Sequence, residues 1–211
     1  MKEFEEVIFD VTQCALELEE FGRLLASRGE LSERDDILPF FRRSRHLSAF
    51  LGSCHPRLAG QVRLVGHEYK LVGDFGADLV VGDRARSAFC FIEFEDATPR
   101  SIFRRTSRSI PAWAPRFHQG FGQIVDWFWK LSEVQHTPDF ARRFGGFAPD
   151  FVGLLVIGRT ADLGTVEHDR MRWFRRYVVV NSKHVHCCTF DELYEDLRDR
   201  LEAFSRPRLA S

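Results

Sequence analysis

The sequence predicts an α/β protein in which a mixed β-sheet is flanked by helices. Helical and strand-like segments follow one another in the order α-α-β-β-β-α-β-α-β-α, which is typical of this class. The segment 151–157 is a continuous apolar run, as expected for a strand that is buried on both faces. The 211 residues are 44% hydrophobic and 13% aromatic, which provides a substantial core and excludes a disordered chain.

The first part of the chain is predicted to be helical. Apolar residues recur at helical spacing from Phe4 to Leu25 and Gly29 follows them, so we expect one amphipathic helix over about 3–28. Pro39 is suited to a first helical turn, and a second helix is expected from there to about residue 53.

The middle and the end of the chain contain the predicted strands. Three short segments rich in Val, Leu and Phe, at 61–72, 76–82 and 88–95, predict an antiparallel meander. Residues 97–114 are predicted to form a loop. The expected order after it is a helix at about 116–132, a strand at 151–158, a helix at about 165–175, a strand pair around 177–187 and a helix at 190–204. Thr189 and Glu192 have the spacing of a capping box for the last helix.

Charge is distributed unevenly along the chain. Residues 1–36 contain 11 acidic and 4 basic residues, a net charge of −7, whereas residues 37–211 carry a net charge of +6. We therefore expect an acidic helical extension over 1–36 and one main domain over 37–211. The acid-free stretch 97–125 contains five arginines: Arg100, Arg104, Arg105, Arg108 and Arg116. Such a stretch is typical of a phosphate-binding surface, and the alternative is a surface that docks the acidic N-terminus.

Several classes of protein do not fit the sequence. The apolar runs are far shorter than the roughly 18 residues of a membrane span, so no membrane partner is expected. The acidic N-terminus has no signal-peptide pattern, which predicts a cytoplasmic location. The five cysteines are odd in number and lack C-x-x-C spacing, which argues against a disulfide framework and a structural zinc site. His184 and His186 alternate in a strand next to Cys187 and Cys188, but a zinc site needs a better fourth ligand than the sequence offers, so they are interpreted as ordinary strand residues.

Three carboxylates lie in two consecutive predicted strands. Asp78 belongs to GADLVV, and Glu93 and Glu95 belong to CFIEFED. Strand periodicity places Glu93 and Glu95 on one face, with Phe94 on the other. If the two strands are antiparallel neighbours, Asp78 approaches Glu93, and the two acids form an oxygen site suited to Mg²⁺ or Mn²⁺. The alternative is a set of solvated acids at strand ends.

Motifs in a fixed order extend this pattern over roughly residues 45–204. FIEFEDATPRSIFRR, HQGFGQIVDWFWKL, VGLLVIGR and CCTFDELYEDL together resemble the Shedu family of bacterial anti-phage defence proteins. The resemblance implies a restriction-endonuclease-like core of the PD-(D/E)xK type over 37–211. It also implies metal-dependent cleavage with Mg²⁺ or Mn²⁺, DNA as the substrate and assembly into homo-oligomers.

The resemblance also assigns site residues. Asp78 and Glu93 match the metal-binding acids, and Gln123 matches the glutamine that opens the following helix and positions water or a phosphate oxygen. Glu95 stands where many nucleases of this fold have a lysine that orients the attacking water and offsets negative charge. Glu95 would instead bind a second metal or act as a general base, or cleavage has been lost and DNA binding kept.

Two basic residues have alternative roles. Lys130 shares a helix face with Gln123 and would replace the missing lysine, or it is a solvated surface residue. Arg159 would reach a phosphate, or it forms a structural salt bridge.

The leading function is a Mg²⁺-dependent DNA endonuclease of anti-phage defence. The alternatives are a catalytically inactive module of the same fold that binds nucleic acid or a protein, and an interaction protein that oligomerises through its N-terminal helix.

Overall fold

The fold is built on a six-stranded mixed sheet with the strand order β1-β2-β3-β4-β7-β10. The computed structural model describes residues 4–58, 62–73, 75–107 and 109–205. The sheet strands are β1 (Glu5–Glu6), β2 (Leu64–Val72), β3 (Phe75–Asp83), β4 (Ala88–Phe94), β7 (Asp150–Val156) and β10 (His186–Cys188). Two small ribbons are formed by β5 (Phe103–Arg104) with β6 (Ala112–Trp113), and by β8 (Val179–Val180) with β9 (Lys183–His184).

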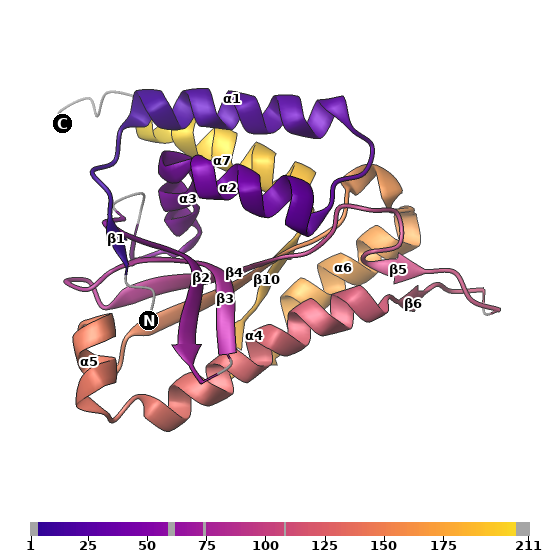
Figure 1. The fold of residues 1–211 in the computed structure, drawn as a ribbon. Helices are drawn as coiled ribbons and strands as arrows, with labels where there is room; N and C mark the ends of the chain where they lie inside the picture. Colours follow the sequence, from indigo (N-terminus) through magenta and orange to yellow (C-terminus); the bar gives the residue numbers. More distant parts are fainter. Residues whose placement is uncertain (1–3, 59–61, 74, 108, 206–211) are drawn as a thin grey trace, which may run out of the picture.

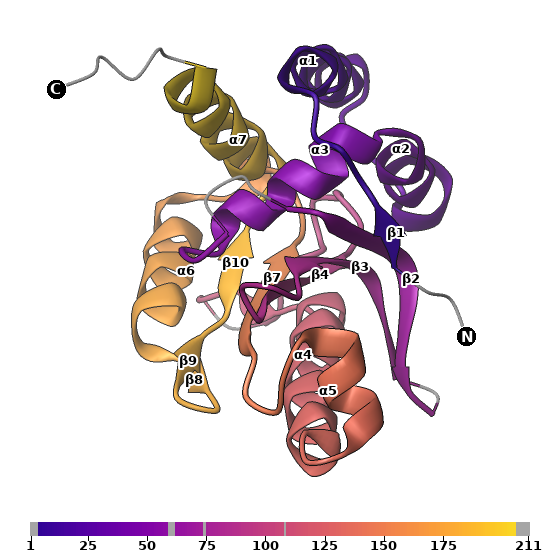
Figure 2. The same ribbon diagram turned by 90° about the vertical axis from the view of Figure 1, so that its left-hand side faces the viewer.

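Helices cover both faces of the sheet (Figures 1 and 2). On one face lie α1 (Val11–Ser27), α2 (Leu38–Arg43), α3 (Arg45–Phe50) and α7 (Phe190–Ser205). On the other face lie α4 (Pro115–Val134), α5 (Pro138–Phe144) and α6 (Thr165–Tyr177). The three layers confirm the predicted α/β class, and the mixed sheet is that of a nuclease-like α/β fold.

Strand pairing in the centre of the sheet positions the acidic residues. β2, β3 and β4 are consecutive antiparallel neighbours, which confirms the predicted meander, and Leu79 pairs with Ile92. β7 then runs parallel to β4, between β4 and β10, with Leu155 opposite Glu93. The long connection through α4 and α5 makes this parallel pairing possible, since parallel neighbours need a crossover.

Alternation along β4 separates two apolar cores. Phe94 stacks on Phe41 of α2, with ring centroids 4.4 Å apart, in the core beneath α1, α2, α3 and α7. Phe91 faces the opposite core, where its ring lies 6.3 Å from that of Trp127 in α4. Odd-numbered positions at the end of β4 therefore point towards α4, and this places the acids beside that helix.

The first helix begins later than the sequence predicts. Asp10 has extended backbone angles and accepts hydrogen bonds from the N–H groups of Thr12 and Gln13, at 2.8 and 3.1 Å, so the helix starts at Val11. Residues Glu5–Glu6 instead form an edge strand on β2. The prediction of a helix over 3–28 was wrong before the N-cap, because the apolar spacing of Phe4 and Val7 fits the sheet edge and the core as well as a helix.

The second predicted helix is broken. A π-helical turn at Glu33–Ile37 leads into α2, and Ser44 separates α2 from α3 with φ −91° and ψ 72°. Glu17 of α1 accepts the Leu47 N–H at 2.7 Å, so a buried side chain of another helix satisfies the start of α3. The short helix α5 was not predicted; it begins at the cap Thr137 and ends at Gly145, whose φ is 78°.

The C-terminal helix is capped and tied to the N-terminal one. The predicted capping box is present, with the Thr189 N–H donating to Glu192 at 2.8 Å and the Glu192 N–H donating to Thr189 Oγ1 at 3.1 Å. Arg159 donates to Asp191 at 2.9–3.0 Å and to the backbone oxygens of Leu25 and Arg28 at 3.0 and 3.1 Å. Arg159 thus takes the structural one of its two expected roles.

The structure bears on the cysteines and on the lengths of the apolar helices. All five cysteines are free thiols, in agreement with the absence of a disulfide framework. Within the described ranges, the helices are all too short or too polar to cross a bilayer.

Candidate active site

Asp78 and Glu93 lie next to each other where the β3–β4 ladder ends. Since Leu79 pairs with Ile92 in antiparallel register, the next step along the ladder brings Asp78 opposite Glu93. The Asp78 carboxylate accepts the Phe94 N–H at 2.9 Å, and the Asp78 backbone in turn donates to the carboxyl group of Glu93. The two acids therefore lie on the same side of the sheet, on the side of α4.

Burial dominates the electrostatics of these acids. Only 5% of Glu93 and 1% of Glu95 is exposed. Burial, reinforced by the charges of the neighbouring acids, raises the pKa of Glu93 far above its usual value, and burial likewise raises the pKa of Asp78. Burial raises the pKa of Glu95 to about 8, although the positive charge of Arg116 acts in the opposite direction.

Three carboxylate oxygens in the site are buried without a hydrogen-bond partner. They are Glu93 Oε2 and both side-chain oxygens of Glu95. The Nε atom of Arg116 lies 3.0 Å from Glu95 Oε2, which is an ion pair but lacks hydrogen-bond geometry. Buried polar atoms are rarely left unsatisfied, because the loss of hydration is costly. The three oxygens are therefore suited to a cation or to bound protons.

Helix α4 approaches Glu95 closely because residue 120 is a glycine. A Cβ atom at Gly120 would lie 2.9 Å from Glu95 Cγ and 2.7 Å from Leu155 Cδ1. Gly122, on the same helix, has open space around the corresponding position. The close approach buries Glu95 between the helix and the sheet.

Arg116 lies at the rim of the acid site. Its Nε atom donates to Asp96 at 3.1 Å, its Nη2 atom contacts the same carboxylate, and Nη1 lies 3.8 Å from Glu33. Asp96 also accepts the Glu33 N–H at 2.9 Å. The sequence pattern groups Arg116 with the other arginines of 97–125 and does not point to Glu33 or Asp96. Asp96 directly follows Glu95, but Glu33 lies more than 60 positions away and no local pattern points to it.

Gln123 and Lys130 are not joined to the acids by hydrogen bonds. The Gln123 side chain is half-buried in α4, and within the described residues it has no side-chain hydrogen bond to Asp78, Glu93 or Glu95. Lys130 donates to Glu133 at 2.8 Å on the helix surface. The structure thus gives Lys130 the surface role and leaves the position usually held by lysine to Glu95.

Three of the other arginines line a groove of about 1020 Å³ beside the 98–105 loop. Arg100, Arg104 and Arg105 are exposed, and none of them forms an ion pair with an acid in the described part of the chain. Among the described arginines of this stretch, Arg116 is the one that pairs with an acid of the N-terminal segment, Glu33. Arg108 lies outside the described residues.

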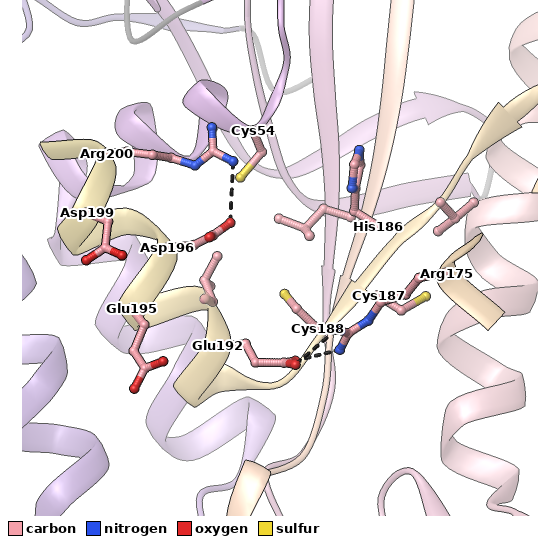
Figure 3. Close-up of a pocket in the computed structure, with 13 residues that line it drawn as sticks. Cys54, Arg175, His186, Cys187, Cys188, Glu192, Glu195, Asp196, Asp199 and Arg200 are labelled. Atoms are coloured by element: carbon pink, nitrogen blue, oxygen red, sulfur yellow. Dashed lines mark hydrogen bonds and ion pairs between the residues drawn. The ribbon is translucent and has the colours of Figure 1, made fainter. Parts of the chain in front are cut away.

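A second cavity, of about 610 Å³, lies between β10 and α7 (Figure 3). Its arginines are engaged: Arg175 binds Glu192 at 2.9 and 2.5 Å, and Arg200 contacts Asp196 at 3.4 Å. His186 and Cys187 belong to its wall. Over the whole described part of the chain, neither this cavity nor the acid site gathers three or more His, Cys, Asp or Glu side chains in an arrangement that would hold a metal ion.

The mixed sheet, its covering helices and the carboxylates at the end of its meander define a nuclease-like α/β protein. The sequence profile described as "Shedu protein SduA, C-terminal" matches residues 30–194. The chain belongs to the Shedu family, and this membership implies a role in anti-phage defence. No curated protein sequence matches the chain.

Proposed function

We propose that this protein is a metal-dependent DNA endonuclease that hydrolyses phosphodiester bonds in anti-phage defence, with Mg²⁺ or Mn²⁺ as its cofactor. The observation that carries the proposal is the set of buried carboxylate oxygens of Glu93 and Glu95, beside Asp78, that lack a hydrogen-bond partner within the described residues. Surface acids without a function would remain hydrated, since burial without a partner costs free energy.

The residues present fit a hard cation. Asp78 and Glu93 would hold it, and Mg²⁺ is commonly bound by one or two carboxylates together with waters and substrate phosphates. Such a site does not need three protein ligands. When bound, the cation would supply Lewis-acid polarisation of the scissile phosphate and a more acidic water.

The remaining residues have roles that follow from their positions. Glu95 accepts the proton of the attacking water, because its buried carboxylate lies beside Glu93, on the same side of the sheet, and burial strengthens it as a base by raising its pKa. Gln123, on α4, orients the water or a phosphate oxygen. Arg100, Arg104 and Arg105 bind the DNA backbone on either side of the cut through the groove that they line.

The test is cleavage of supercoiled plasmid with Mg²⁺, Mn²⁺ or EDTA. The parent protein is expected to nick or linearise the plasmid only with a divalent ion, and Asp78→Ala is expected to abolish cleavage. Asp126→Ala removes an exposed acid from α4 and is the matched control. Equal cleavage by Asp78→Ala and Asp126→Ala would contradict the proposal.

A second candidate is a nuclease-fold module that binds DNA or a partner protein without cutting. It is favoured by the acid at position 95 and by the engagement of Lys130 with Glu133, which leave the site without the usual lysine. This candidate predicts no cleavage by the parent, salt-dependent DNA binding, and weak activity gained by Glu95→Lys.

Assembly into homo-oligomers is part of the same proposal. It follows from the resemblance to a family whose members associate. Light scattering after size-exclusion chromatography tests it, and a mass equal to one chain at micromolar concentration would contradict it.

A further inference from the structure

Arg116 has a guanidinium group that is only partly used by the protein. It stands in the first turn of α4, and 36% of its side chain is exposed. Its Nε and Nη2 atoms contact Asp96, while Nη1 has only Glu33, at 3.8 Å, beyond hydrogen-bond distance. Arg116 thus keeps donors available at the entrance to the site that contains Glu95.

The residue that faces Nη1 belongs to a segment fastened across the end of β4. We call residues 31–33 the strap. Leu31 exchanges two backbone hydrogen bonds with Ala97, at 3.1 and 2.9 Å, and the Glu33 N–H donates to Asp96 at 2.9 Å. These bonds fix the backbone of the strap, whereas the Glu33 carboxylate has only the loose ion pair with Arg116 to hold it against the guanidinium.

We propose that Arg116 contacts a phosphate oxygen of DNA next to Glu95, and that Glu33 occupies this guanidinium until the phosphate displaces it. The inference rests on the proposed function and concerns how its substrate is admitted. A nuclease site lined by acids repels DNA, and a cation at its rim offsets that repulsion. The exchange favours the phosphate, since a charge-assisted hydrogen bond is shorter and stronger than an ion pair at 3.8 Å.

Glu33 differs from an ordinary surface acid in one measurable way. Glu33 acts through Arg116, so its effect on DNA binding depends on the presence of that arginine. Glu30, three positions earlier and exposed, carries the same charge. A general electrostatic effect of the acidic N-terminus would act equally through Glu30 and Glu33, whether or not Arg116 is present.

The experiment is a double-mutant cycle on DNA binding, measured by fluorescence anisotropy with a labelled duplex in EDTA, so that cleavage does not interfere. Arg116→Met is expected to weaken binding about tenfold, within the range of a lost charged hydrogen bond. Glu33→Gln is expected to tighten binding roughly threefold, the scale of an exposed ion pair. In the Arg116→Met background, Glu33→Gln is expected to change the Kd by less than a factor of two. Glu30→Gln is the matched control.

The outcomes separate this inference from the proposed function. Unchanged binding in Arg116→Met, or equal effects of Glu33→Gln and Glu30→Gln, would overturn the inference even if the parent cuts DNA. A parent that does not bind DNA contradicts the proposed function itself. Arg116→Lys, which keeps the charge, should lose less affinity than Arg116→Met. Thermal melting of each variant identifies any loss of binding that reflects unfolding. A folded Arg116→Lys protein that binds as weakly as Arg116→Met would count against a charge contact with phosphate at this position.

Discussion

Glu95 is confined by α4 on two sides: Gly120 leaves room for its side chain, and Arg116 lies against its carboxylate. A working proton acceptor at this position predicts that Glu95→Gln lowers the cleavage rate by about 10²–10⁴-fold, the usual contribution of a general base. DNA binding should persist or tighten, because one negative charge is removed. Plasmid cleavage and anisotropy measure the two effects, with the exposed Glu202→Gln as control. Full activity in Glu95→Gln would leave Glu95 without a catalytic role.

His55 provides a pH dependence that is independent of the acid site. Its side chain is fully buried, Nε2 lies 3.1 Å from the backbone oxygen of Asp150, and Nδ1 accepts the Arg57 N–H at 3.1 Å. This pattern requires the neutral ring, and burial lowers the pKa of His55 from its usual value of 6.5.

The sign of the effect follows from the lowered pKa. The unfolded chain takes up a proton at His55 as the pH falls through 6.5, while the folded protein resists it. The contribution of His55 to the free energy of unfolding should therefore decrease at pH values below 6.5, by up to about 1.4 kcal/mol per pH unit until the pKa of the folded state is reached. The buried acids Asp78, Glu93 and Glu95, whose pKa values are raised, act in the opposite direction, so the His55 contribution is obtained by comparing variants. Urea unfolding at pH 7.5 and 5.5 should show that lowering the pH costs the parent more stability, or gains it less, than it does His55→Asn, whereas His118→Asn, an exposed control, should match the parent.

At the scale of elements, the two glycines of α4 make a direct comparison possible. Gly120→Ala should destabilise the protein by about 1–3 kcal/mol, the usual cost of overpacking, and displace Glu95. Gly122→Ala has open space and should stabilise the helix by up to about 1 kcal/mol. Urea unfolding gives both values. A stabilising Gly120→Ala would show that α4 can move away from β4.

The sequence predicted the elements whose signal is local. Alternation and apolar runs identified the strands of the meander, and the Thr189–Glu192 spacing identified the cap of α7. Two other features were decided by tertiary contacts. The start of α1 is displaced because residues 5–6 find a partner in β2, and the break at Ser44 is compatible with the fold because Glu17 satisfies the start of α3.

In the candidate site, too, some residues could be predicted from local sequence patterns and others depend on tertiary contacts. Asp78, Glu93 and Glu95 could be grouped from strand periodicity, since adjacent antiparallel strands place nearby residues together. The ion pairs of Arg116 and the presence of Glu33 could not be predicted, because they depend on how the chain before α2 crosses the end of β4.

At the scale of the whole molecule, the groove lined by Arg100, Arg104 and Arg105 predicts an electrostatic contribution to DNA binding. Replacing all three with alanine should lower the slope of log Kd against log salt concentration by about three units, close to one for each phosphate contact. Arg23, Arg172 and Arg198, exposed elsewhere, form the matched control set. An unchanged slope would mean that DNA binds elsewhere on the protein.

The position of β7 has a consequence for the time at which the site forms. The strand that carries Glu93 is paired on one side with β3, its neighbour in the chain, and on the other with a strand made some 60 residues later. Closing a loop of that length and forming parallel pairs are slow steps in folding. On the ribosome, the meander can assemble first. The backbone N–H of Glu95 can donate its hydrogen bond to the Val156 oxygen only after β7 has emerged. In a nascent chain, Glu95 therefore lacks its contact with β7 until residues 150–156 have emerged, and the site is complete only once this strand has joined the sheet.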